Sequence, residues 1–220
     1  MIIMPLRCCF GESMFITFEG GEGSGKTTCI REAATALRDQ GYDVLLTREP
    51  GGTLLGDALR TLLLDAKSQA PVSSRAELLL FCAARAQLVT EVLQPHLDKG
   101  GVVLCDRYAD STLAYQGYGR GLPLDTLHTI LAFATGGLWP HMTLYLAITP
   151  EQGLQRRRQQ DWDRLDALEI SFHRRVHAGY EVLMAEEPER WRRIDASQPL
   201  EQVCQSVITT IEQALVARPS

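Results

Sequence analysis

Short apolar runs alternate with longer amphipathic stretches along the whole chain. Residues 15–18, 42–47, 102–105, 142–148 and 191–194 are rich in β-branched, aromatic and aliphatic side chains and predict strands. The run at 102–105 is apolar at every position, as in a strand buried on both faces. Strands that alternate with helices predict a doubly wound α/β fold: a five-stranded parallel sheet with helices on both faces.

The segments between these runs carry the periodicity and capping signals of helices. Apolar residues between 55 and 63 recur on one helical face, and longer helices are predicted over 166–186 and 199–216. Ser74 and Glu77 read as a capping box that starts a helix to about Leu97, bent near Pro95. A short helix over 110–116 is expected to lead into a glycine-rich loop at 117–121.

Composition and charge narrow the class of protein. The chain has 220 residues, of which 45% are apolar and 22% charged, as in one soluble globular domain. A net charge of −5 argues against a broad basic face for nucleic acid, and no apolar stretch is long enough to span a membrane. We expect a single domain over 14–220. Met14 is the expected natural start, with a disordered extension over 1–13.

The six cysteines carry no recognisable metal or disulfide framework. There is no C-x-x-C pair, and four of the cysteines lie in apolar runs, where a free thiol acts as a small buried hydrophobe. The sequence therefore predicts no disulfide, no zinc and a reducing, cytoplasmic location.

The segment that follows the first strand fits the pattern G-x4-G-K-T. A strand before it and a helix after it are the context that makes this pattern a P-loop, whose backbone N–H groups bind phosphate. Lys26 can reach the β- and γ-phosphates, and the Thr27 hydroxyl can ligate Mg²⁺, so ATP and Mg²⁺ are expected. The loop comprises Gly20, Gly21, Glu22, Gly23, Ser24, Gly25, Lys26 and Thr27.

Two arginines at strand ends indicate a second anion site. Arg48 and Arg107 each follow a predicted strand, and the carboxyl ends of parallel strands meet at the ligand-binding edge. Guanidinium groups there suit a second phosphate. A P-loop switch protein has no such phosphate to hold, and the chain lacks the Asn-Lys-x-Asp motif of GTPases. Phe81 and Arg85, four residues apart on one helix, can hold a base, although a phenylalanine in such a helix more often belongs to the core.

Several blocks together resemble one enzyme family. They are FEGxEGxGKTT at 18–28, TREPGGT at 47–53, LLLD at 62–65, FxAARxQ at 81–87, DRYxxSTxAYQG at 106–117 and IDASQP at 194–199. In this order and over most of the chain, they resemble the bacterial thymidylate kinases, which have a P-loop nucleoside monophosphate kinase fold.

The resemblance implies transfer of the γ-phosphoryl group of ATP to dTMP. Phe81 would stack on thymine, Arg85 would bind its carbonyl edge, and Tyr115 would exclude a ribose 2′-hydroxyl. Glu22 would face the sugar 3′-hydroxyl and help to organise Mg²⁺. For Asp106 the sequence leaves two roles open: it could bind Mg²⁺ through water or orient Arg107. The residues implied for dTMP are Glu22, Arg48, Pro50, Phe81, Arg85, Arg107, Thr112, Tyr115 and Gln116. The family also implies a homodimer.

The family has two types, which differ in where the arginine that acts on the transferring phosphoryl group lies: within the P-loop or in a mobile lid. The P-loop has no arginine at its variable positions, whereas residues 156–165 contain several. The chain thus resembles the type with arginines in a mobile lid, and Arg156 and Arg158 join Lys26, Arg48 and Arg107 as predicted catalytic residues; Arg157 and Arg164 are also candidates. Another nucleoside monophosphate kinase or a deoxynucleoside kinase is the alternative.

Overall fold

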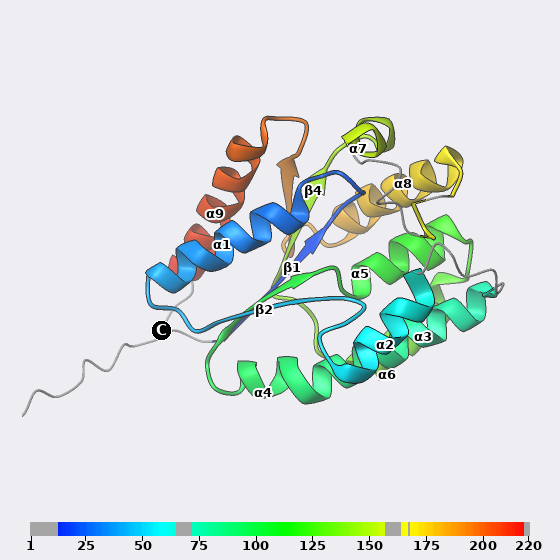
Figure 1. The fold of residues 1–220 in the computed structure, drawn as a ribbon, viewed down its shortest axis with the longest axis horizontal. Helices are drawn as coiled ribbons and strands as arrows, with labels where there is room; N and C mark the ends of the chain where they lie inside the picture. Colours follow the sequence, from blue (N-terminus) through cyan, green and yellow to red (C-terminus); the bar gives the residue numbers. More distant parts are fainter. Residues whose placement is uncertain (1–12, 65–71, 157–163, 167, 218–220) are drawn as a thin grey trace, which may run out of the picture.

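The computed structural model describes residues 13–64, 72–156, 164–166 and 168–217. Within this range, five strands form one parallel sheet in the order β2-β3-β1-β4-β5 (Figure 1). The strands are β1 (Met14–Glu19), β2 (Val44–Arg48), β3 (Val102–Asp106), β4 (Met142–Ala147) and β5 (Trp191–Asp195). The predicted parallel sheet is confirmed. The predicted extension over 1–13 lies almost wholly outside the described residues.

Helices cover both faces of the sheet, because the central strands are apolar on both sides. Every residue of β1 and β4 is buried. On one face, α1 (Lys26–Asp39) and α9 (Leu200–Val216) lie side by side (Figure 1). The other face packs on α3 (Ser74–Leu88), α6 (Leu124–Thr135) and α8 (Ile170–Glu186). The remaining helical segments are α2 (Leu54–Leu64), η1 (Val89–Leu93), α4 (Gln94–Leu97), α5 (Ala109–Thr112), η2 (Leu113–Gly119) and α7 (Pro150–Arg156).

Four predictions about the helices need correction. The cap of α3 is Ser73, whose Oγ accepts from the amide of Ala76 at 3.3 Å, and not Ser74. The helix to Leu97 is interrupted by the π-helical segment η1, which precedes Pro95. The expected loop at 117–121 begins as helix, since η2 extends to Gly119. A Cβ at Gly119 would lie 2.6 Å from the ring of Phe172, so glycine at this position lets η2 pack closely on α8. The helix predicted from 166 begins at Ile170.

The prediction of no disulfide is wrong. Cys29 of α1 and Cys204 of α9 form a disulfide, with their Cα atoms 4.5 Å apart. The two residues are 175 positions apart in sequence, and only the packing of α1 on α9 brings them together. Cys82 and Cys105 are free and buried, as expected for small hydrophobes. In the described part of the chain, no helix combines the length and apolar character needed to cross a bilayer.

Candidate functional site

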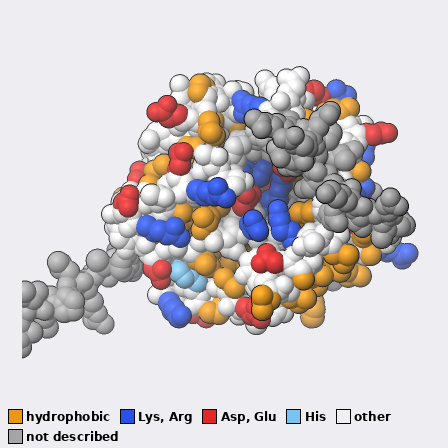
Figure 2. Space-filling model, viewed as in Figure 1, with side chains coloured by type: hydrophobic (Ala, Val, Ile, Leu, Met, Phe, Trp, Pro, Cys, Tyr) orange, Lys and Arg blue, Asp and Glu red, His pale blue; other side chains and the backbone are white. Residues whose placement is uncertain are grey.

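A cavity of about 400 Å³ opens at the carboxyl edge of β1, β2 and β3. The strand register explains the position of the cavity. Asp106 of β3 pairs with Arg48 of β2 on one side and with Phe18 of β1 on the other, so the three strands end together. Lys and Arg side chains gather around the hollow (Figure 2). Of the predicted site residues, the cavity is lined by Glu22, Gly23, Ser24, Gly25, Lys26, Thr27, Arg48, Pro50, Phe81, Arg85, Asp106, Arg107, Thr112, Tyr115 and Gln116.

The P-loop runs between β1 and α1 and packs against α7. Gly23 has a φ of 70°, and a Cβ there would lie 2.0 Å from the carbonyl oxygen of Gly153. Glycine is therefore required both for the left-handed backbone and for the close approach of α7. Gly25, also left-handed, precedes the first residue of α1, so the helix begins directly at the cavity. This is the strand-loop-helix geometry that binds phosphate.

Lys26 is held by its own loop. Its Nζ donates to the carbonyl oxygens of Gly20 and Gly21, at 2.9 and 2.8 Å. Burial, with the nearby charge of Arg107, lowers the pKa of the ammonium. Gly20 and Gly21 do not line the cavity themselves, but they position the lysine at its wall.

Thr27 and Asp106 form the candidate magnesium site. The Thr27 hydroxyl donates to Oδ2 of Asp106 at 3.2 Å. The other carboxylate oxygen, Oδ1, is buried and has no hydrogen-bond partner among the described residues. Mg²⁺ prefers oxygen ligands and keeps water and phosphate oxygens in its shell, so it needs few protein ligands. The hydroxyl and the unpartnered carboxylate oxygen therefore fit a magnesium ion held mainly by nucleotide phosphates.

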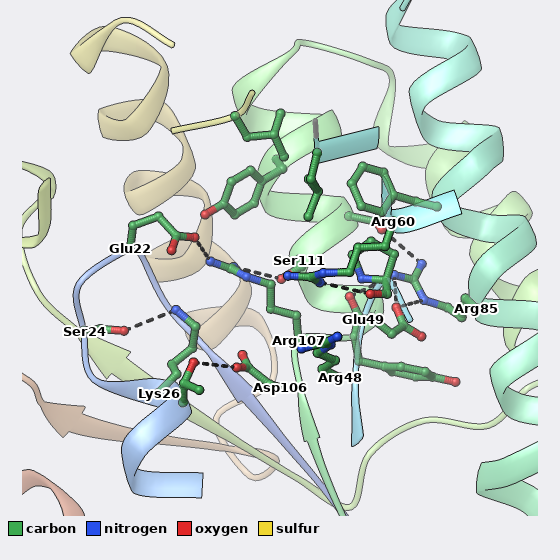
Figure 3. A pocket seen from close by; sticks show the side chains of 18 of the residues that line it. Glu22, Ser24, Lys26, Arg48, Glu49, Arg60, Arg85, Asp106, Arg107 and Ser111 are labelled. Atoms are coloured by element: carbon green, nitrogen blue, oxygen red, sulfur yellow. Dashed lines mark hydrogen bonds and ion pairs between the residues drawn. The ribbon is translucent and has the colours of Figure 1, made fainter. Parts of the chain in front are cut away.

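Arg107 crosses the cavity toward the P-loop. It has a positive φ of 69°, and its guanidinium forms an ion pair with Glu22 (Figure 3). The same guanidinium lies 5.0 Å from the ring centroid of Tyr115. It also donates to Ser111 Oγ at 3.3 Å. The arginine is thus fixed from two sides at the point where the two halves of the cavity meet.

Behind Arg107 lies a buried carboxylate that sequence reasoning missed. Glu19 ends β1, is fully buried, and accepts hydrogen bonds from Ser111 at 2.6 Å and from Tyr180 at 2.7 Å. Burial and the nearby charge of Asp110 raise the pKa of Glu19 to about 7. Its sequence signal was a charged residue that directly follows a predicted strand of mostly apolar residues.

The far end of the cavity is formed by α3. Arg85 donates to Glu49 at 2.8 Å, to the Thr112 hydroxyl at 3.0 Å and to the carbonyl of Tyr108 at 3.1 Å. Arg85 and Glu49 are both buried, whereas Phe81 is half-buried and faces the cavity. The alternative in which Phe81 serves only the core is thereby weakened. Sequence reasoning missed Glu49, although it lies within the TREPGGT block.

Arg60 is a further cavity residue that the sequence did not single out. It comes from α2, and its guanidinium donates to the carbonyl oxygen of Pro50 at 3.0 Å (Figure 3). Its only signal was a basic side chain on the polar face of an amphipathic helix. Together with Arg48 it adds positive charge on the side of the cavity opposite the P-loop.

The structure does not bring the described lid candidates into the cavity. Arg156 donates to the carbonyl oxygens of Ala196 and Ser197, at 2.7 and 3.1 Å. Arg164 donates to Glu77 at 2.5 Å and to the carbonyl of Leu63 at 2.8 Å. In this conformation, each of the two guanidinium groups donates these hydrogen bonds to acceptors outside the cavity. Arg158 and the other residues of 157–163 lie outside the described residues.

Comparisons with known proteins agree on one family. A family model described as thymidylate kinase matches residues 18–207. The thymidylate kinase of Roseiflexus castenholzii is 50% identical, over 94% of this chain and 96% of that protein. That of Bacillus pumilus is 45% identical, over 92% and 96%. The crystal structure of thymidylate kinase from Ehrlichia chaffeensis, 32% identical, superposes with a TM-score of 0.76 and covers 91% of this chain and 100% of that one.

Proposed function

The chain belongs to the thymidylate kinase family, and we propose that it carries out the family's reaction in the cavity at the carboxyl edge of β1, β2 and β3. The enzyme phosphorylates dTMP to dTDP, with ATP as the phosphoryl donor. Its fold is that of the P-loop nucleoside monophosphate kinases.

One observation carries the assignment of the cavity. A single continuous hollow connects the P-loop, the arginines of two strand ends and the Phe81/Arg85 pair. These three groups suit the donor phosphates, the acceptor phosphate and the acceptor base, in that order along the cavity. A protein that only binds and hydrolyses ATP has no use for the second and third groups.

Positioning and charge stabilisation account for the chemistry. The attacking atom is a phosphate oxygen of dTMP, which is already ionised near neutral pH, so no strong base is required. The main obstacle is repulsion between two polyanions. Lys26 neutralises the donor phosphates, while Arg48 and Arg107 hold the acceptor phosphate. Arg107 then exchanges Glu22 for that phosphate, and the freed carboxylate faces the sugar 3′-hydroxyl.

The base and sugar are held by side chains from α3 and η2. The Phe81 ring stacks on the base, and Arg85 donates to a carbonyl of thymine. Tyr115, whose ring centroid lies 5.0 Å from the guanidinium of Arg107, would exclude a ribose 2′-hydroxyl. Pro50 borders the nucleotide, and Thr112 and Gln116 complete the pocket.

Thr27 and Asp106 would hold Mg²⁺, which screens phosphate charge when bound. Glu22, itself a P-loop residue, would help to organise Mg²⁺ once its ion pair with Arg107 has separated. The assignment of Arg156 and Arg158 to the transferring phosphoryl group stays a prediction, tested by the turnover of Arg156→Ala against that of Arg158→Ala.

We further propose a cytoplasmic homodimer. The nucleotide substrates support the cytoplasm. Large apolar side chains are exposed on α2 and α3, among them Leu62 at 51% and Leu79 at 57%, and pairing of these helices between two copies would cover them. A monomer mass in sedimentation at micromolar concentration would exclude this dimer.

A panel of acceptors tests the function. With ATP and Mg²⁺, dTMP is expected to be phosphorylated fastest, dUMP more slowly and UMP poorly, because the latter carries a 2′-hydroxyl. The alternative, another nucleoside monophosphate or deoxynucleoside kinase, predicts that a different acceptor exceeds dTMP. Rapid ATP hydrolysis without any acceptor would contradict the kinase assignment.

A further inference from the structure

Glu77 is a buried carboxylate that lies behind the base end of the cavity, where it bonds to the lining residue Gln116, and the reaction assigns it no role. It lies on α3 four residues before Phe81 and eight before Arg85, so the three side chains share one face of the helix. Its side chain is completely inaccessible to solvent. The sequence predicted that Glu77 forms a capping box with Ser74. Ser73 caps α3 instead, so the Glu77 carboxylate does not serve that predicted capping box.

The Glu77 carboxylate accepts hydrogen bonds from two arginines and from one side-chain amide. Gln116 donates from Nε2 to Oε1 of Glu77 at 2.9 Å. Arg120 donates to both carboxylate oxygens, at 3.2 and 3.0 Å, and Arg164 donates to Oε2 at 2.5 Å. Of these three donors, only Gln116 also lines the cavity.

These contacts decide the charge of Glu77 and the orientation of Gln116. Burial alone would raise the pKa of Glu77, but the hydrogen bonds from Arg120, Gln116 and Arg164 outweigh it and hold the pKa below its usual value. An ionised carboxylate can only accept hydrogen bonds. Gln116 must therefore turn its nitrogen to Glu77, and its amide oxygen is the group that it can offer to a ligand.

We propose that Glu77 is a positioning residue that sets base selectivity by holding Gln116 with its amide oxygen toward the base. This inference rests on the proposed dTMP site. The cavity then offers an acceptor from Gln116 beside the guanidinium of Arg85, which can only donate. Thymine matches this pair, because N3–H donates and O4 accepts. Cytosine presents the reverse, an accepting N3 and a donating amino group, and would leave buried groups unpaired.

The test compares acceptors as well as variants. Glu77→Gln replaces a pure acceptor with an amide that tolerates either orientation of Gln116. We expect the ratio of kcat/KM for dTMP to that for dCMP to fall by about tenfold or more, mainly through KM. Glu77→Asp keeps the charge among the arginines but withdraws the carboxylate by one methylene, and it should lower the same ratio. Arg75→Gln is the matched control: it changes an exposed arginine of the same helix, two residues before Glu77, so the ratio should stay at the wild-type value.

A second measurement uses the wild-type enzyme and so does not depend on variant folding. dTMP methylated at N3 lacks the hydrogen that the amide oxygen accepts, and it should be a poorer acceptor than dTMP by about a hundredfold. Equal use of the two acceptors, or an unchanged dTMP-to-dCMP ratio in a folded Glu77→Gln variant, would overturn the proposal. If the wild-type enzyme fails to phosphorylate dTMP at all, the proposed function fails instead.

Discussion

Arg107, which follows β3, and Glu22, in the P-loop, form an ion pair across the cavity (Figure 3). The pair joins a residue assigned to the acceptor phosphate with one assigned to the acceptor sugar. Each therefore has a protein partner before substrate binds, and neither charge is left buried alone. In the proposed binding mode, dTMP binds only when this pair separates, so the phosphate of the acceptor would compete with the carboxylate of Glu22 for Arg107.

The first prediction concerns Arg107 itself. Arg107→Ala removes the guanidinium that bridges the two halves of the cavity, and turnover of dTMP should fall by about 10³-fold, within the range for arginines that stabilise phosphoryl transfer. Steady-state kinetics with dTMP and ATP measure this loss, and thermal melting reports whether the variant folds. Arg31→Ala, at an exposed position of α1, is the control and should keep normal activity. Near-normal turnover in Arg107→Ala would remove this residue from the mechanism.

The second prediction is a pH dependence of stability that originates at Glu19. Its pKa is raised from 4.5 to about 7 by burial, followed by the charge of Asp110. The native protein therefore binds more protons than the unfolded chain between these pH values. The stabilisation from Glu19 is fully present below pH of about 4.5 and is lost as the pH rises through about 7.

Urea unfolding of the wild type and Glu19→Gln checks this sign. Because glutamine does not titrate, the difference in free energy of unfolding between variant and wild type should shift in favour of the variant as pH rises from ~5 to ~8, by at most about 3 kcal/mol. A difference that is constant over this range would show that Glu19 has an ordinary pKa.

The third prediction concerns the buried pair of Arg85 and Glu49. Arg85→Ala leaves the Glu49 carboxylate buried without its cation, which should cost about 3–5 kcal/mol of stability at neutral pH. Adding Glu49→Gln removes the uncompensated charge, so the double variant should recover part of that loss while activity with dTMP stays low. Chemical denaturation measures the first quantity and kinetics the second. Additive losses in the double variant would contradict this coupling.

The fourth prediction follows from the disulfide between α1 and α9. In oxidising buffer, a peptide map without reductant should contain the Cys29 peptide joined to the Cys204 peptide, while Cys82 and Cys105 react with an alkylating reagent only after unfolding. Reduction should lower the free energy of unfolding by about 2–4 kcal/mol. Cys204→Ala serves as the comparison, since it should be insensitive to reductant. Free Cys29 in the oxidised native protein would exclude the bond.

The sequence by itself determined the sheet and predicted the two anion sites, because both depend on local signals. An apolar run of strand length predicts a buried strand wherever it occurs, and a Gly-rich loop before a helix predicts a phosphate site from its own residues. Arg48 and Arg107 could be placed together because carboxyl ends of parallel strands share one edge. Phe81 and Arg85 could be paired because helix geometry fixes neighbours four residues apart.

Tertiary structure alone decided which partners the buried polar groups find. Glu77 reads locally as part of a helix cap, yet it bonds to Gln116, 39 residues away. Glu19 meets Tyr180 across 161 residues, and Cys29 meets Cys204 across 175. No periodicity or spacing encodes such pairs, because they depend on how whole helices pack against the sheet. A buried polar group must still find a partner wherever packing places it, and in this protein those partners are what position the side chains of the cavity.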